Sequence, residues 1–381
     1  MAKSTIYLDY AAASPLDPKV LKVMEPYLKN RFYNPSANYL PAKNVRADVE
    51  KARSNVAQIM GAKPEEIIFT AGGTESDNLA VRGVMDKYPN SSVIVSAIEH
   101  EAVAAPAKRY DHKTIGVDKN GMVDPRQLKK IIDDKTVVVS IIYANNEIGT
   151  IEPIAQISKL IKAVRQDRTQ RKIKLPLYFH TDACQAPAYL DLHISRLGVD
   201  LMSLNGGKIY GPKQSGILYV NRHVKLRPLV LGGGQEFGVR SGTENVASII
   251  GFSESLKLVQ ARKSEESIRL DGLKAEFIKQ VKSKITGVSI NGEGTKTLPN
   301  NISVTFPGRD AEELLLKLED QGVLCASGAA CSANNQSISA TLLAIGLSPA
   351  KAKSTLRFTT GVQTKVKDLN ATIEALLSIL A

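Results

Sequence analysis

The feature that most constrains the fold is a regular alternation of short β-branched runs with longer helical stretches. The runs are EEIIFT, SSVIVSA, TVVVSII, LPLYFHT, VDLMSL and SGILYV, and each leads into polar or glycine-rich residues. Residues 154–168, between the third and fourth runs, have the spacing of an amphipathic helix. This order predicts βαβ units and an α/β fold with a mostly parallel sheet.

The pattern changes after about Val246. A long helical stretch over residues 248–285 is followed by the strand ISVTF, the helix AEELLLKLEDQ, the strand STLRFTT and the helix LNATIEALLSIL. This order predicts a second, smaller α+β domain. We assign residues 16–255 to the large domain, and residues 1–15 together with 256–381 to the small one.

The composition restricts the class of protein. With 43% hydrophobic and 23% charged residues, the 381-residue chain is typical of a globular protein and unlike a disordered, collagen-like or disulfide-stapled one. Its longest apolar runs are far shorter than the roughly 18 residues that span a bilayer. The first residues lack a signal-peptide pattern, and three cysteines suit a reducing compartment, so we expect a cytoplasmic location.

The chain carries a formal net charge of +12, from 50 Lys+Arg against 38 Asp+Glu. These basic residues are scattered rather than gathered in one stretch, so we expect no direct nucleic-acid binding. RNA binding remains an alternative, which strongly salt-dependent retention of RNA would support.

Residues that follow the predicted strands deserve attention because ligands of parallel sheets bind beyond the carboxyl ends of the strands. The first run leads into AGGTESDNLAV, where Gly73 and Thr74 open a helix. Backbone N–H groups at a helix start bind anions, and the Thr74 hydroxyl adds a donor. A tight turn before a capped helix is the alternative interpretation.

The later runs lead into His100, Asn146, Asp182 with Gln185, and the block NGGK that ends at Lys208. Each residue alone could be a cap, a turn residue or a surface charge. Together they place an imidazole, amides, a carboxylate and an amine at one sheet edge. A pyridoxal 5'-phosphate (PLP) site needs these groups, since an amine binds the aldehyde, a carboxylate faces the pyridine nitrogen and an anion cup holds the phosphate.

Sequence blocks along nearly the whole chain resemble one enzyme family. They are LDYAAASP, NPSANY, FTAGGTESDNLA, EHEAV, NNEIGT, TDACQ, GKIYGPKQSG, LGGGQEFGVRSGTEN, SGAACSA and LRFTTG. In this order they are similar to those of class V, fold-type-I PLP enzymes, and within that class to NifS/IscS-like cysteine desulfurases. The resemblance implies a large domain with a mostly parallel seven-stranded sheet and a smaller C-terminal α+β domain.

The resemblance also assigns roles around the cofactor. It implies that Lys208 is the Schiff-base lysine, that Asp182 pairs with the pyridine nitrogen, and that His100 stacks over the ring. Gln185 and Asn146 would contact the ring hydroxyl or the substrate. It implies no metal site.

The phosphate cup of the family is altered here. The resemblance places Gly73 and Thr74 in the cup, and it implies that Thr243 of the RSGT block reaches the phosphate of a neighbouring subunit in a homodimer. The family's lysine block commonly reads S-x-H-K, whereas this chain reads NGGK. Gly207 therefore offers only a backbone N–H and Asn205 its amide, so we expect an altered but functional cup.

Cys331 is the expected nucleophile. It lies in SGAACSANNQS, a small and polar segment similar to the family's SGSACTS loop. From the residues alone, an incidental loop cysteine is the alternative. The resemblance implies that Arg357 binds the substrate α-carboxylate. From the residues alone, the alternative interpretation of Arg357 is an exposed arginine on a strand. Cys184, beside Asp182, is expected to pack as a small apolar residue.

The implied reaction converts L-cysteine to L-alanine and leaves the sulfur as a persulfide on Cys331. A sulfur-acceptor protein, such as an iron–sulfur scaffold or a tRNA-thiolation enzyme, would take it onward. The chain ends at Ala381 soon after its last predicted helix, so we do not expect the longer scaffold-docking tail of many members. A selenocysteine lyase, another class V aminotransferase, and a catalytically silent PLP-fold binding protein remain alternatives.

Overall fold

The computed structural model describes residues 5–328 and 338–380. Its main element is a seven-stranded sheet, as the resemblance implies. The strands, in spatial order, are β2 (Ile67–Thr70), β8 (Gly216–Val220), β7 (Leu201–Asn205), β6 (Tyr178–Asp182), β5 (Thr136–Ser140), β3 (Ser92–Ser96) and β4 (Asp111–Ile115).

The sheet is parallel except for β8, which runs antiparallel to both β2 and β7. The pairs β3–β4, β3–β5, β5–β6 and β6–β7 are all parallel. The six runs singled out in the sequence form strands of this sheet, but β4 is absent from that prediction. Its sequence, DHKTI, lies at the sheet edge and exposes most of its polar side chains, so it lacks the apolar run of a buried strand.

Helices cover both faces of the sheet. On one face α3 (Gly73–Lys87) and α4 (Glu101–Ala107) pack over a core that contains Ile68 and Val95. The other face carries a larger core with Ile67 and Phe69. Its covering helices are α2 (Leu40–Met60), α5 (Pro125–Ile131), α6 (Ile154–Gln170) and α7 (Ile194–Leu197). Successive residues of β2 thus contribute side chains to the cores on opposite faces of the sheet, as the pleat of a strand requires.

A smaller antiparallel sheet builds a second core. Its strands are β12 (Ala326–Ser327), β13 (Thr355–Thr359), β10 (Asn301–Thr305) and β9 (Ser289–Asn291). Phe277, Leu314, Phe358 and Leu376 are buried together between this sheet and its helices. The helices of this part are α9 (Ala311–Asp320), α10 (Ala340–Ala344), α11 (Pro349–Ala352) and α12 (Val366–Leu380).

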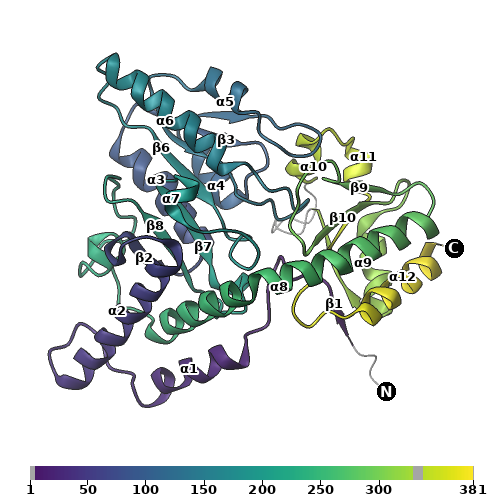
Figure 1. The fold of residues 1–381 in the computed structure, drawn as a ribbon, viewed down its shortest axis with the longest axis horizontal. Helices are drawn as coiled ribbons and strands as arrows, with labels where there is room; N and C mark the ends of the chain where they lie inside the picture. The colour runs from purple at the N-terminus through teal and green to yellow at the C-terminus, as the bar shows by residue number, and fades with distance from the viewer. Residues whose placement is uncertain (1–4, 329–337, 381) are drawn as a thin grey trace.

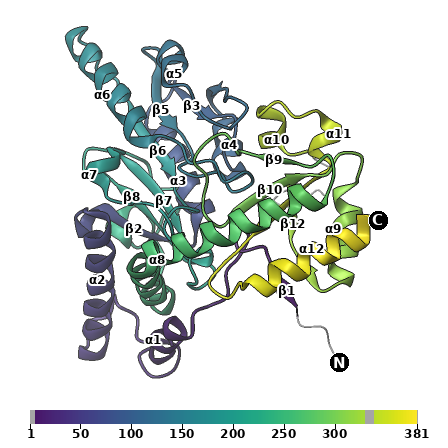
Figure 2. The same cartoon turned by 45° about the vertical axis from the view of Figure 1, so that its right-hand side comes forward.

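The long helix α8 (Val246–Lys284) connects the two cores. Its first half buries Phe252 and Leu256 against the large sheet, and its second half buries Phe277 and Val281 against the small one. Figures 1 and 2 show it running from the large sheet to the small sheet, where α12 lies beside it. The helix α1 (Pro18–Lys29) packs against the first half of α8.

The N-terminal segment also reaches the smaller part, because β1 (Ile6–Tyr7) pairs in parallel with β11 (Val323–Leu324). The 3-10 turns are η1 (Pro64–Glu66), η2 (Gly206–Lys208) and η3 (Glu236–Gly238). The exact domain boundaries stay a prediction. Among the helices of the described ranges, none combines the length and apolar character that crossing a membrane requires.

Candidate active site

A cavity lies at the carboxyl edge of the large sheet. Its lining residues come from the ends of β6 and β7, from the starts of α3 and α4, and from the segment after β5; they are Gly73, Thr74, Asp77, His100, Ile142, Ala144, Asn146, Asp182, Cys184, Gln185, Asn205 and Lys208. A neighbouring cavity shares Gly73, Thr74, Asn205 and Lys208 and adds Gly207 and Lys213. Nine of the residues expected at a cofactor site therefore line one continuous region.

The Lys208 amine is held at this edge by the N-terminal segment. Lys208 ends η2, directly after β7, and its Nζ donates to the carbonyl oxygen of Ala11 at 2.9 Å. Gln185 Nε2 donates to the same oxygen at 2.9 Å. One carbonyl thus fixes both the amine and the amide beside the cavity. Sequence reasoning missed Ala11, because its contribution is a backbone atom that leaves no side-chain signal.

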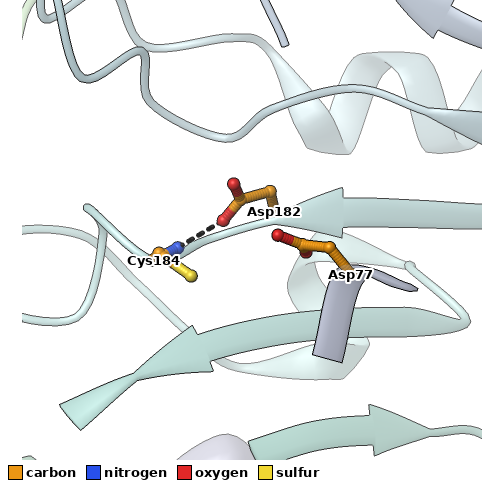
Figure 3. A group of neighbouring side chains, drawn as sticks. All are labelled: Asp77, Asp182 and Cys184. Carbon is orange, nitrogen blue, oxygen red and sulfur yellow. Dashed lines mark hydrogen bonds between the residues drawn. The ribbon is translucent and has the colours of Figure 1, made fainter. Parts of the chain in front are cut away.

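Asp182, the last residue of β6, lies within a buried acidic cluster with Asp77 and Cys184 (Figure 3). One side-chain ligand atom from each residue lies within 4.8 Å of the others. Asp182 Oδ1 accepts a hydrogen bond from the Cys184 backbone N–H at 2.9 Å. This bond fixes the carboxylate at the strand end, where it faces the cavity.

Burial and the neighbouring charge shift the pKa values of two members of this cluster, Asp77 and Cys184. Burial, and then the charge of Asp182, raises the pKa of Asp77 well above its usual range, so Asp77 tends to keep its proton. The same two causes raise the pKa of the Cys184 thiol. A thiol must lose its proton to bind a metal, so this environment does not favour a metal ion at the three side chains.

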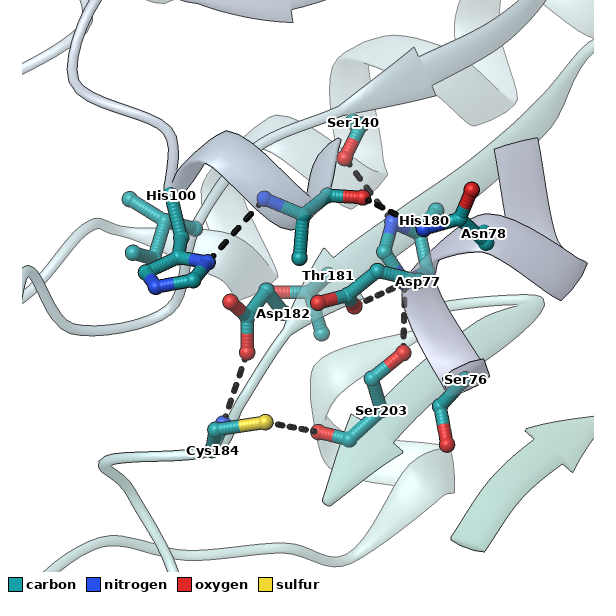
Figure 4. A network of polar contacts seen from close by, with 12 residues as sticks. Ser76, Asp77, Asn78, His100, Ser140, His180, Thr181, Asp182, Cys184 and Ser203 are labelled. Atoms are coloured by element: carbon teal, nitrogen blue, oxygen red, sulfur yellow. Dashed lines mark hydrogen bonds and ion pairs between the residues drawn. The ribbon is translucent and has the colours of Figure 1, made fainter. Parts of the chain in front are cut away.

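His180 supports the cluster from the middle of the sheet. Its ring contacts Ser140 Oγ at 2.8 Å through Nδ1 and Ser203 Oγ at 3.1 Å through Nε2. Asp77 Oδ1 lies 3.6 Å from the same Nε2. Figure 4 shows these side chains meeting between the strand ends and α3. Ser203 and His180 lie in the strands, so their polar contacts tie β5, β6 and β7 together beneath the cavity.

His100 has two structural roles. It is the N-cap of α4, where its Nδ1 accepts the Ala102 N–H at 3.0 Å, and its side chain also lines the cavity. The cap role and the site role are therefore compatible rather than alternatives. Figure 4 shows the imidazole on the opposite side of Asp182 from Cys184.

Arg357 lies in the centre of β13 and is 2% exposed, so the interpretation as an exposed strand arginine is wrong. Its Nη1 donates to the carbonyl oxygen of Asn146 at 3.0 Å, and its Nη2 donates to Asp9 Oδ1 at 2.7 Å. Through Asn146 the guanidinium adjoins the cavity, although it does not line it. Sequence reasoning missed Asp9 because the pairing joins segments nearly the whole chain apart.

The turn between β2 and α3 has the form of an anion site. Gly72 has φ of +132°, a conformation that favours glycine, and α3 begins at the next residue. In the described part of the chain, the N–H groups of Gly73 and Thr74 have no hydrogen-bond acceptor. Nearby, the Gly207 N–H donates to Asn205 Oδ1 at 2.9 Å. The N–H that we expected Gly207 to offer an anion is thus already bonded.

Thr243, which the resemblance places at a cofactor phosphate, does not line this cavity. Thr243 is exposed and lines a separate pocket with Glu236 and Arg240, which leaves its assignment to a neighbouring subunit's site a prediction. Cys331 lies outside the described residues. Asp77 is the clearest side chain that sequence reasoning missed: it stands three residues after Thr74, a helical spacing that places both on the cavity side of α3.

The class V aminotransferase family model matches residues 6–371 of this chain. A cysteine desulfurase IscS of Dictyoglomus turgidum is 40% identical over 99% of this chain and 95% of its own length. One from Methanosarcina thermophila is 36% identical over 98% and 92%. The chain belongs to the class V aminotransferases and, among them, to the IscS-like cysteine desulfurases.

Solved structures agree with this family assignment. A NifS-like protein superposes with a TM-score of 0.90 at 29% identity and covers 99% of both chains. A structure described as SspA in complex with cysteine gives a TM-score of 0.79 at 32% identity, covering 93% of this chain and 98% of the other. The family's fold-type-I architecture is therefore the fold of this chain.

The residues present fit PLP. A lysine amine, a buried carboxylate and a set of unpartnered helix N–H groups line the same region, as the cofactor's aldehyde, pyridine nitrogen and phosphate require. Lys208 would hold the aldehyde carbon, Asp182 the nitrogen, and Gly73 with Thr74 the phosphate.

Gly73 and Cys184 occupy adjoining space in this region. A Cβ on Gly73 would lie 2.5 Å from Cys184 Sγ, which is far inside contact distance. We expect Gly73→Ala to push α3 away from Cys184 and to weaken PLP binding to the apoenzyme by roughly tenfold, because overpacking costs about 1–3 kcal/mol. Adding Cys184→Ala should restore the affinity, which a fluorescence titration with PLP would measure. Equal affinities for both variants would contradict this coupling.

Acid should destabilise the fold through His180. Burial lowers its pKa from 6.5 to about 4. Between these values the unfolded chain binds a proton that the folded chain does not, so stability from a neutral His180 is present at pH 7 and is lost as the pH falls towards 4. Urea unfolding should show the stability advantage of wild type over His180→Gln shrinking by up to about 3 kcal/mol over this range. A constant advantage of His180 over this range would refute the argument.

Proposed function

We propose that this chain is a PLP-dependent cysteine desulfurase that converts L-cysteine to L-alanine and keeps the sulfur as a persulfide on Cys331. The observation that supports this most is the meeting of the Lys208 amine and the buried Asp182 carboxylate at one cavity, with His100 and Asn146 at its wall. The relatives named cysteine desulfurase IscS indicate the reaction class.

Bound through its aldehyde to the Lys208 amine, PLP would supply an electron sink for negative charge at the substrate α-carbon. Asp182 would keep the pyridine nitrogen protonated, which this sink requires. The Lys208 amine would also carry the substrate α-proton. The Ala11 carbonyl gives that amine a fixed resting position, because it accepts from Nζ at 2.9 Å.

Arg357 and Asn146 would bind the substrate carboxylate. The carboxylate has to compete with Asp9 for the guanidinium, since Asp9 Oδ1 accepts a hydrogen bond from Arg357 Nη2 at 2.7 Å. Among the described residues, no acceptor faces the buried Nε of Arg357. This N–H is therefore a second point of attachment for a substrate oxygen.

Sulfur transfer is a displacement at the substrate sulfur. The thiolate of Cys331 forms an S–S bond as the Cβ–S bond of L-cysteine breaks, and the electron pair of that bond stays with the carbon product. This product takes up protons, with Lys208 as the carrier, and leaves as L-alanine. His100 would accept the substrate thiol proton.

The active unit we propose is a homodimer in which Thr243 reaches the partner's phosphate cup. Large apolar side chains are exposed around α1, the start of α2 and the segment before Thr243, which is where a subunit contact would cover them; they are Leu28, Phe32, Tyr39, Leu40 and Leu231. The persulfide would pass to an iron–sulfur scaffold or a tRNA-thiolation enzyme.

The first test is the visible spectrum of the purified protein with PLP. We expect an absorbance band that Lys208→Ala abolishes, because the covalent link to the amine is lost. Lys213→Ala is the matched control, since Lys213 lines the neighbouring cavity. Survival of the band in Lys208→Ala would refute the lysine assignment.

The second test separates the nucleophile from the cofactor. Wild type should release sulfide and alanine in equal amounts from L-cysteine with a thiol reductant, and Cys331→Ser should keep the spectrum while stopping sulfide release. Full sulfide release by Cys331→Ser would refute the persulfide step. Pyruvate or an exchanged amino group instead of alanine would indicate another class V reaction.

A further inference from the structure

The paired strands β10 and β13 of the small sheet have one apolar and one polar face. The apolar residues at alternate positions lie in the second core; they are Ile302, Val304, Leu356 and Phe358. The polar residues between them are Asn301, Ser303, Thr305, Thr355, Arg357 and Thr359. Because side chains alternate along a strand, these polar side chains share the opposite face. Asn301 pairs with Thr359, and Ser303 pairs with Arg357, so Asn301 and Arg357 are diagonal neighbours on this face.

Asn301 and Arg357 both bind one backbone atom in the segment after β5. Asn301 Nδ2 and Arg357 Nη1 each donate to the carbonyl oxygen of Asn146, both at 3.0 Å. A carbonyl oxygen has two lone pairs, so these two donors satisfy it. Asn146 is buried and lines the cavity of the proposed site. The two strands of the small sheet are thus attached to the cavity wall through a single oxygen.

The bond to Asn146 is the one hydrogen bond that the Asn301 side chain makes among the described residues. The side chain is 2% exposed, and no donor in residues 5–328 and 338–380 faces its buried Oδ1. Burying an amide costs free energy unless the amide is hydrogen-bonded, so an apolar side chain would suit the packing of β10 better. The contact with Asn146 is therefore what distinguishes an asparagine at this position.

The Asn146 carbonyl in turn orients Arg357. The guanidinium is bonded through Nη1 to this carbonyl and through Nη2 to Asp9, while its buried Nε has no acceptor within the described residues. Because the N–H groups form a rigid planar fork, these two bonds set the plane of the whole group. With Asn301 removed, the carbonyl would be free to turn, and the guanidinium would turn with it. Asn301 therefore fixes the direction in which Arg357 presents its Nε edge.

We propose that Asn301 is a positioning residue for the α-carboxylate of the substrate, because it holds the Asn146 carbonyl in the place from which Arg357 is oriented. This inference rests on the proposed function, in which Arg357 and Asn146 bind that carboxylate. It assigns Asn301 no contact with the substrate or the cofactor.

A second asparagine of the same sheet provides a matched control. Asn291 on β9 is also buried, and its Nδ2 donates to Ser303 Oγ and Thr305 Oγ1, both at 3.1 Å. None of its side-chain hydrogen bonds within the described ranges reaches Asn146 or Arg357. Asn291→Ala therefore removes a buried amide from the small sheet without freeing the Asn146 carbonyl.

The test compares wild type, Asn301→Ala, Asn291→Ala and Arg357→Ala. Calorimetric titration of the holoenzymes gives the Kd of L-alanine, the product that carries the same carboxylate, and sulfide release from L-cysteine gives KM and kcat. A fluorescence titration of the apoenzymes gives the Kd of PLP. We expect Asn301→Ala to raise the Kd of L-alanine and the KM by roughly 5- to 10-fold, the factor that corresponds to one net hydrogen bond. Its kcat and its Kd of PLP should not change, because the lost contact acts on substrate binding alone. Asn291→Ala should match wild type in all four quantities.

The inference is overturned if Asn301→Ala binds L-alanine as Asn291→Ala does, or if it weakens PLP binding as much as L-alanine binding. Should Asn301→Ala not fold, Asn301→Val lacks the same donor and suits a strand, and it must weaken L-alanine binding selectively for the inference to stand. If Arg357→Ala leaves L-alanine binding unchanged, the proposed carboxylate site is wrong, and the role of Asn301 falls with it. If only Arg357→Ala weakens L-alanine binding, the carboxylate site stands and the inference about Asn301 fails.

Discussion

The parallel register of β5, β6 and β7 is the constraint on which the rest of the site depends. It ends the three strands at one edge, so Asp182 closes β6 while Lys208 follows β7 within three residues. The hydrogen bonds of His180 to Ser140 and Ser203 lock this register from inside the sheet. A slip of one residue in β6 would turn Asp182 to the opposite face.

Burial of polar groups is the cost of this arrangement. Asp77 on α3, His180 in β6 and Cys184 just after β6 are all buried near Asp182, and burial shifts the pKa of each in the direction that favours its neutral form. The neutral neighbours let one carboxylate be presented to a cofactor without a second negative charge beside it. The amine opposite is oriented by a backbone carbonyl, which cannot be lost by substitution of a side chain.

Much of this could be predicted from the sequence because strand ends are visible as motifs. His100, Asn146, Asp182 and Lys208 each follow an apolar run, and a parallel sheet must gather them. The edge strand β4 was not predicted, because its exposed polar residues have the pattern of a loop. Two contacts were not predicted for another reason, because each joins segments that are far apart in the chain. They are the pairing of Arg357 with Asp9 and the contact of Glu147 with Ser339.

The most direct test of the account is to locate the lysine that binds the cofactor. The holoenzyme is reduced with borohydride, which makes the lysine–cofactor bond permanent, then digested, and its peptides are sequenced by mass spectrometry. We expect the modification on Lys208 alone. Modification of Lys213, which lines the neighbouring cavity, or of no lysine at all would contradict the claim that the edge formed by β6 and β7 is the catalytic site.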